Sequence, residues 1–189
     1  MQEICIDEQF NNLDFTQKAP PSRDFDGCSF TGCNFNGINI SSFNFIDCTF
    51  TNCNFSMVNI AGTSFKNAVF TDCKLMGVDF GKCNDLLLSF TFVRCQLDYA
   101  FFYKKKLKKT QFKECSIQEA NFTESDLSLS VFQKCDLSRT TFDRTNLSGA
   151  DLRSAFNYSI DPESNQIKKA KFSLEGIRGL LEKYDIEIS

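Results

Sequence analysis

The chain has 189 residues and a net charge of −3 at pH 7, which predicts a single domain large enough to bury a core. It contains no histidine, so catalytic triads and metal sites that depend on histidine are excluded. We find no long apolar run and no signal-peptide pattern, and we therefore expect neither a membrane-spanning helix nor a membrane partner.

Residues 1–24 are predicted to form an N-terminal cap and an irregular first coil. Phe10 and Phe15 begin a spacing of five residues between large apolar side chains. Pro20 and Pro21 then interrupt the pattern, because proline cannot donate a ladder hydrogen bond, and a loop or bulge is expected there. The spacing survives the interruption, since Phe25 follows Phe15 by ten residues.

Residues 25–86 keep this spacing without a miss up to Phe80. Neither an α-helix nor a half-buried strand places a period of five on one face, so the pattern indicates a repeat architecture. The large apolar positions are Phe25, Phe30, Phe35, Ile40, Phe45, Phe50, Phe55, Ile60, Phe65, Phe70, Leu75 and Phe80.

Residues twenty apart are also alike. Phe25, Phe45 and Phe65 form one column of identical residues, and Cys33 and Cys53 begin another. If one coil has four five-residue sides, residues twenty apart stack at the strand spacing of about 4.8 Å. The sequence therefore predicts an all-β fold, a right-handed quadrilateral β-helix with four five-residue sides per coil.

The small, polar and large residues of each side follow one order. Cys33-Asn34-Phe35, Cys53-Asn54-Phe55, Ala120-Asn121-Phe122 and Ala150-Asp151-Leu152 are examples. This order resembles the pentapeptide-repeat family, and the resemblance covers most of the chain. It implies the same four-sided β-helix.

Ten cysteines raise the alternatives of a disulfide scaffold or a zinc site. Nine occupy the small inward slot and Cys5 fits the large slot, where they act as apolar fillers. A C-x4-C spacing places neighbouring cysteines on different sides of the coil, which disfavours tetrahedral zinc ligation. We expect no metal, no cofactor and no catalytic residue, and the free thiols favour a cytoplasmic location.

The pattern slips by two residues between Gly81 and Leu86 and is predicted to resume at Leu87. A second β-helical stack is then expected over residues 87–172, with columns such as Phe102, Phe122 and Phe142. The insertion is interpreted as a bulged corner or, alternatively, as a kink or hinge that shapes a partner surface.

Five lysines surround Leu107. We name Lys104, Lys106, Lys108 and Lys109 as a candidate partner surface. Lys105 falls in an inward slot; an ion pair with Asp85 is one possibility, but the cost of burying a charge favours a bulge that turns it outward. A solvated face that blocks edge pairing is the more ordinary explanation of the cluster, and no direct nucleic-acid partner is expected.

Residues 173–189 are predicted to form a short α-helix capped by Ser173, followed by a short strand at Ile186 and Ile188. A helix this short must dock, either on the last coil alone or also against a second copy. The candidate dimer interface is Leu174, Ile177, Leu180, Leu181, Tyr184, Ile186 and Ile188.

This ending, with Leu180-Leu181-Glu182-Lys183-Tyr184 before Ile186-Glu187-Ile188, resembles the C-termini of quinolone-resistance (Qnr-type) members of the family. The resemblance implies a homodimer that imitates duplex DNA and binds a type II topoisomerase, DNA gyrase or topoisomerase IV. Residues 1–100 carry eleven acidic and six basic side chains, whereas residues 101–160 carry seven acidic and ten basic. Because this charge is uneven, a generic protein-binding scaffold with no DNA-mimic role stays open as the alternative.

Overall fold

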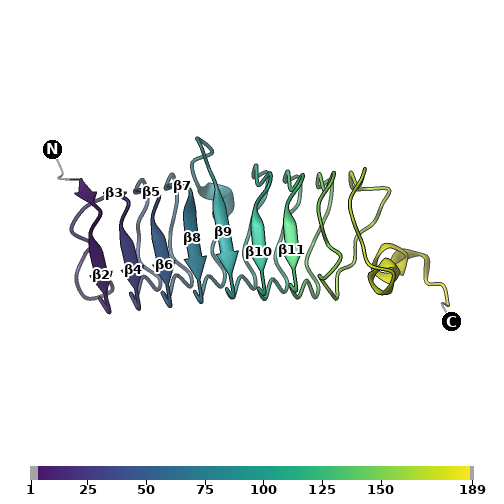
Figure 1. The fold of residues 1–189 in the computed structure, drawn as a ribbon, viewed down its shortest axis with the longest axis horizontal. Coiled ribbons are helices and arrows are strands. Elements are labelled where there is room, and N and C mark those ends of the chain that lie inside the picture. The colour runs from purple at the N-terminus through teal and green to yellow at the C-terminus, as the bar shows by residue number, and fades with distance from the viewer. Residues whose placement is uncertain (1–3, 188–189) are drawn as a thin grey trace.

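The computed structural model describes residues 4–187 as an elongated rod of stacked coils (Figure 1). The coils up to β11 carry short strands, turns form the rest of the rod, and the C-terminal segment lies at one end. The strands are β1 (Cys5–Ile6), β2 (Gln9–Asn11), β3 (Asp24–Asp26), β4 (Ser29–Thr31), β5 (Asn44–Ile46), β6 (Thr49–Thr51), β7 (Ser64–Lys66), β8 (Ala68–Thr71), β9 (Phe90–Val93), β10 (Gln111–Lys113) and β11 (Val131–Gln133).

The strands form two parallel sheets whose order follows the order of the coils. One sheet is β1-β3-β5-β7 and the other is β2-β4-β6-β8-β9-β10-β11. Phe25 pairs with Phe45 and Phe45 with Phe65, so residues twenty apart are neighbours, as predicted. The four-sided β-helix is therefore confirmed. β1 and β2 pair with β3 and β4, so they belong to the first coil of the rod.

The interior of the rod is filled by stacked aromatic rings. Phe80, Phe102 and Phe122 lie in one column, with centroids 4.7 Å apart at each step and planes within 7° of parallel. All three side chains are buried. Such contacts contribute about 0.5–1.5 kcal/mol per pair beyond the burial of apolar area.

Tight turns close the sides that carry no long strand. The N–H of Ile38 donates to the carbonyl of Phe35 (3.3 Å), and Gly37 between them has a positive φ of 63°. This is the geometry of a type II turn. In the later coils the same turn replaces the strand on the side that carries β1, β3, β5 and β7. There, for example, the N–H of Thr110 donates to the carbonyl of Leu107 (3.1 Å). The sheet on this side therefore ends at β7.

The two-residue insertion lies between Asn84 and Ser89. Up to Asn84, whose N–H donates to the carbonyl of Thr63, residues in neighbouring coils that lie side by side are twenty positions apart. Beyond the loop the separation is twenty-two, since Ala68 pairs with Phe90. A single-turn 3-10 helix, η1 (Phe80–Lys82), precedes the loop. The ring stack continues across it, with Phe70 and Phe92 at 5.5 Å.

The prediction that the inward pattern resumes at Leu87 is wrong. Leu87 is 63% exposed because the chain loops outward there. Phe90, which stands in a small inward slot, is buried instead, with its ring 5.5 Å from Phe65 and 5.3 Å from Phe80. Phe90 thus supplies the buried ring at this level, while Leu88 of the loop packs partly buried against the same core.

The prediction that Lys105 turns outward is also wrong. Lys105 is buried, and its Nζ donates to the carbonyl of Cys83 (2.7 Å) and to Oδ1 of Asp85 (2.7 Å). The insertion supplies the charged partner, because Asp85 lies in it, twenty residues before Lys105, while Cys83 just before the insertion supplies the carbonyl. A buried ammonium group is tolerated when it is paired and hydrogen-bonded in this way.

The C-terminal segment consists of 3-10 helices rather than the predicted α-helix. They are η2 (Glu175–Leu180) and η3 (Glu182–Tyr184). Leu174, Ile177 and Leu180 are three apart, which suits three residues per turn, and two glycines weaken the α-helical alternative. The predicted cap is present, since Ser173 Oγ accepts a hydrogen bond from the N–H of Gly176 (3.0 Å).

Two glycines let this segment approach the last coil. A Cβ atom on Gly176 or Gly179 would collide with Tyr158, and Ile160 donates a backbone hydrogen bond to Gly179 (2.8 Å). The predicted terminal strand is not formed at Ile186 or Glu187, and its last residue, Ile188, lies outside the described residues. None of the helices in the described part has the length and apolarity needed to cross a bilayer.

Candidate interaction surfaces

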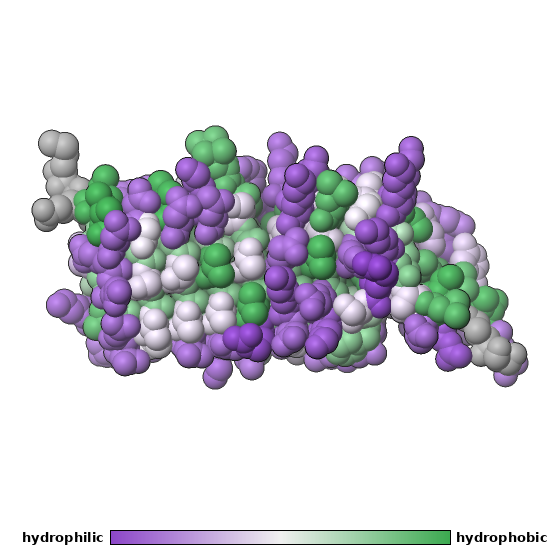
Figure 2. Space-filling view, in the orientation of Figure 1, coloured by the Kyte–Doolittle hydropathy of each residue, from purple (hydrophilic) through white to green (hydrophobic). Residues whose placement is uncertain are grey.

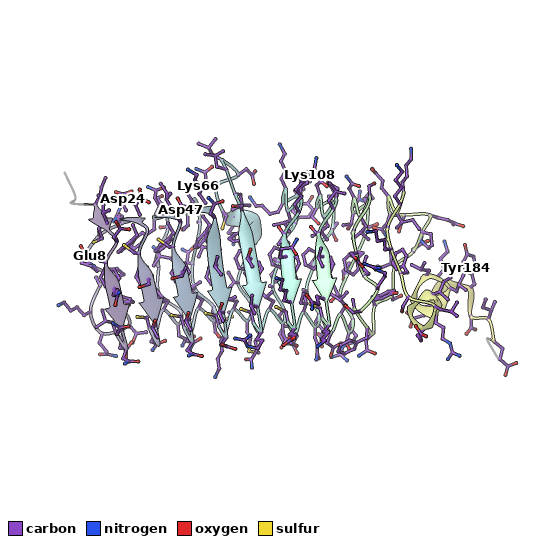
Figure 3. The ribbon with its side chains drawn as sticks, viewed as in Figure 1. Glu8, Asp24, Asp47, Lys66, Lys108 and Tyr184 are labelled. Carbon is purple, nitrogen blue, oxygen red and sulfur yellow. The ribbon has the colours of Figure 1, made fainter. Side chains whose placement is uncertain are left out.

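One edge of the rod separates its charges by sign. Figure 3 shows Asp24 and Asp47 along this edge in the N-terminal half, followed by Lys66 and Lys108. The acidic strip, as we define it, is Asp7, Glu8, Asp24, Asp26 and Asp47. The structure places these residues on the first three coils, around the strands β1, β3 and β5.

No carboxylate of the acidic strip takes part in an ion pair within residues 4–187. Asp24 accepts a hydrogen bond from the side-chain amide of Asn44 (2.5 Å), and Asp47 accepts one from Asn67 (2.7 Å). These neutral partners leave the negative charges uncompensated. The strip therefore projects negative potential from the N-terminal half of the rod.

Several charges elsewhere on the rod are paired between neighbouring coils. Arg94 donates two hydrogen bonds to Asp72 (2.7 and 2.8 Å), and this pairing lowers the pKa of the Asp72 carboxyl. Lys134 lies 3.6 Å from Glu114 one coil further on. These pairs are exposed and contribute little to stability, but they neutralise the surfaces on which they lie.

The candidate partner lysines are exposed, as the sequence analysis requires of a surface. Lys104 differs from the others, because its Nζ lies 3.4 Å from Glu124 and 4.9 Å from the Tyr103 ring centroid. Within the described residues, Lys106, Lys108 and Lys109 have no ion pair. The fold adds Lys168 and Lys169 to the same side, three coils further along.

The sequence analysis missed Lys168 and Lys169 as members of this surface. The signal was available, because Lys108, Ser128, Ser148 and Lys168 are twenty residues apart. Outward residues twenty apart stack in neighbouring coils just as inward residues do, but the prediction used this spacing only for inward residues. The acidic strip was missed for the same reason.

The candidate dimer residues form an exposed apolar end. Leu174 is 82% exposed, and Ile177, Tyr184 and Ile186 are also exposed. Leu180 is half-buried against the core and Leu181 is partly covered, so these two residues also help the segment to dock on its own coil. A groove of about 870 Å³ runs between the last coil and this segment, lined in part by Arg139, Tyr158, Arg178 and Ile186.

The cysteines are packed in the interior. All ten are buried, and none of them forms a disulfide bond within residues 4–187. Cys53, for example, donates its thiol to the carbonyl of Phe30 (3.4 Å), and burial raises the pKa of the Cys48 thiol to about 12. Within residues 4–187, no group of three or more potential ligands is arranged to hold a metal ion.

Two family models match the chain. A pentapeptide repeat region matches residues 23–102, and a model of eight pentapeptide repeats matches residues 120–156; together they cover more than half of the sequence. The chain belongs to the pentapeptide-repeat family. No curated protein sequence matches this member of the family.

Solved structures of QnrB1, a plasmid-mediated fluoroquinolone resistance protein, have the same fold. A trypsin-treated form is 21% identical, with a TM-score of 0.77 over 100% of this chain and 92% of that one. The full-length form is 18% identical, with a TM-score of 0.64 over 97% of this chain and 100% of that one. The fold of this pentapeptide-repeat protein is therefore Qnr-like along its whole length.

Proposed function

We propose that this pentapeptide-repeat protein is a non-enzymatic protein-binding rod that engages a type II topoisomerase and alters its sensitivity to quinolones. The main support is the fold shared with QnrB1, a fluoroquinolone resistance protein, over the whole chain. The filled interior of the coils leaves the surface as the working part of the molecule.

The acidic strip is the part of this surface that resembles DNA. Successive coils repeat at about 4.8 Å, and duplex DNA presents a phosphate at about every 3.4 Å along each strand. Unpaired carboxylates repeated along a rigid edge can therefore occupy a surface built to bind phosphates. The strip ends at Asp47, so it covers only the first three coils of the rod.

We propose a homodimer through the exposed apolar end. Leu174, Ile177 and Ile186 present apolar area to solvent at the tip of the rod, which a second copy would cover. In such a dimer the two acidic strips lie at the far ends and the lysine-rich halves lie in the middle. The acidic surface would then not be continuous across the dimer.

The oligomeric state can be tested by analytical ultracentrifugation. The double substitution Leu174→Glu and Ile177→Glu should convert dimers to monomers. Glu at Leu86 and Leu87, which are equally exposed but lie in the insertion, is the matched control and should leave dimers intact. A wild-type monomer, or a dimer in both variants, would contradict the proposed interface.

The topoisomerase proposal is tested by gyrase-catalysed supercoiling with and without a quinolone. We expect the wild-type protein either to restore supercoiling under drug or to inhibit supercoiling without it. The triple substitution Asp24→Asn, Asp26→Asn and Asp47→Asn should weaken the effect on supercoiling. The control replaces the ion-paired residues Glu114, Glu119 and Asp143 by their amides and should leave the effect unchanged. No effect of the wild-type protein on the host's own gyrase would reject this function.

The alternative is a protein-binding scaffold with no DNA-mimic role, and the sign change along one edge favours it. The lysines of the C-terminal half would repel a phosphate-binding surface that lay along the whole rod. We also propose a reducing location such as the cytoplasm, because none of the ten cysteines forms a disulfide bond within residues 4–187.

A further inference from the structure

The C-terminal half of the charged edge carries a second surface of opposite sign, which we name the lysine face. It consists of Lys106, Lys108, Lys109, Lys168 and Lys169, all exposed. Bridges join Lys106 to Asp126, Asp126 to Asn146 and Asn146 to Gln166, so these residues lie on one side in successive coils. In Figure 2, long hydrophilic side chains project from the upper edge in this half of the rod.

A groove lies between the two groups of lysines. It has a volume of about 300 Å³ and is lined by Lys108, Ser128, Leu129, Ser148, Lys168 and Lys169, together with Gly149. Three coils separate Lys108 from Lys168, which corresponds to about 14 Å at the strand spacing. Lysines from the two groups therefore line one groove, together with Ser128, Leu129 and Ser148 from the coils between them.

The ammonium groups of the lysine face are available to a partner. None of them forms an ion pair with a residue between 4 and 187, although arginines on other sides, such as Arg94 and Arg139, are paired. The acidic residue nearest in register is Asp126. Its carboxylate already accepts hydrogen bonds from the N–H of Ser128 (2.9 Å) and from Asn146 (3.1 Å).

We propose that the lysine face binds the phosphate backbone of duplex DNA without reading its sequence. Duplex DNA carries one negative charge per about 1.7 Å of axis, so a 14 Å stretch faces the lysines with several phosphates. Lysine and serine side chains are typical phosphate contacts, and they position a duplex without specifying bases.

The absence of aromatic side chains from the groove lining favours a duplex over a single strand. Proteins that bind single strands stack the bases on aromatic rings. The exposed rings of Tyr99, Phe101 and Tyr103 belong to earlier positions of the coil and do not line the groove. The lysines around Leu107 alone do not predict a nucleic-acid partner, whereas the fold adds Lys168 and Lys169 to the same side.

The test is fluorescence anisotropy of a labelled duplex of random sequence, titrated with the full chain over a series of salt concentrations. We expect saturable binding at low salt and a log–log salt slope of up to about −4.5 if all five lysines contact phosphates. The triple substitution Lys108→Gln, Lys168→Gln and Lys169→Gln should reduce the magnitude of the slope by about 2.7. It should also weaken binding about tenfold or more at moderate salt.

The matched control carries Gln at Lys74, Lys113 and Lys134, which removes the same charge from other sides of the rod and should change affinity less than about twofold. If the two variants lost equal affinity for the duplex, net charge alone would explain the binding, and the proposal would be overturned. It would also be overturned by no binding to the duplex at low salt, or by binding of a single strand or of polyglutamate as tight as that of the duplex. The assay contains no topoisomerase, so its outcome is independent of the proposed function.

Discussion

The ammonium group of Lys105 lies 2.7 Å from the carboxylate of Asp85, and the two side chains are exposed very unequally. The Lys105 side chain is 5% exposed and that of Asp85 is 56% exposed. The buried partner depends on the exposed one for its charge balance, while the reverse dependence is weak. This asymmetry ties the insertion loop to the coil above it.

We therefore expect the two residues to respond differently to substitution. Asp85→Ala leaves a buried, unpaired ammonium group and should cost about 3 kcal/mol of unfolding free energy. Lys105→Met fills the slot with an apolar chain and leaves Asp85 in water, so its cost should stay near 1 kcal/mol. Urea denaturation measures both, and equal costs would contradict the asymmetry.

Phe90 and Leu87 provide a direct test of the corrected register. Phe90→Ala should cost about 3–5 kcal/mol, because the ring is buried against Phe65 and Phe80. Leu87→Ser should change stability by less than about 0.5 kcal/mol, since the side chain is exposed. If Leu87→Ser proved the more damaging substitution in urea denaturation, the inward position would belong to Leu87 after all.

Phe122 tests the ring stack, and Phe101 is its control. Phe122 is fully buried between Phe102 at 4.7 Å and Phe142 at 5.5 Å, so Phe122→Ala should cost about 3–5 kcal/mol. Phe101 precedes Phe102 in the chain but is 47% exposed, and Phe101→Ala should cost under about 1 kcal/mol. A loss below about 1 kcal/mol for Phe122 would mean that the column is misplaced.

Acid should release the C-terminal segment before the coils unfold. Lys183 Nζ lies 2.6 Å from Asp161 and 2.7 Å from Glu163, and these hydrogen bonds lower the pKa of both carboxyls. A lowered folded-state pKa contributes stability above the unfolded value, about 4, and this stability is lost as the pH falls through the folded values.

Hydrogen exchange, corrected for intrinsic rates, is the measurement for this prediction. Protection of residues 173–187 should fall as the pH drops below the unfolded carboxyl value of about 4, while protection of the coils persists. Lys183→Met should show the same loss at neutral pH, because it removes the shared partner of Asp161 and Glu163. Unchanged protection in acid would show that the apolar contacts of Leu180 and Tyr158 hold the segment without these ion pairs.

Local departures from the repeat were the hardest features to predict. Lys105 was assigned outward on the general cost of burying a charge, which is correct on average but ignores a partner supplied by an irregular loop. Leu87 was assigned inward because it continued the arithmetic of the period. Whether Leu87 or Phe90 fills the interior depends on the path of the loop and on the length of the side chain. The spacing of apolar residues in the sequence specifies neither.

By itself, the sequence determined the coil, the four sides, the inward columns and the packing of most cysteines, because a five-residue period has few geometric solutions and stacking repeats each solution coil after coil. Only the tertiary structure decided the pairing of Lys105, the role of Phe90 and the 3-10 form of the C-terminal segment. The physical reason is that these three features depend on how particular side chains and loop atoms share space, and a periodic pattern carries information only about what repeats.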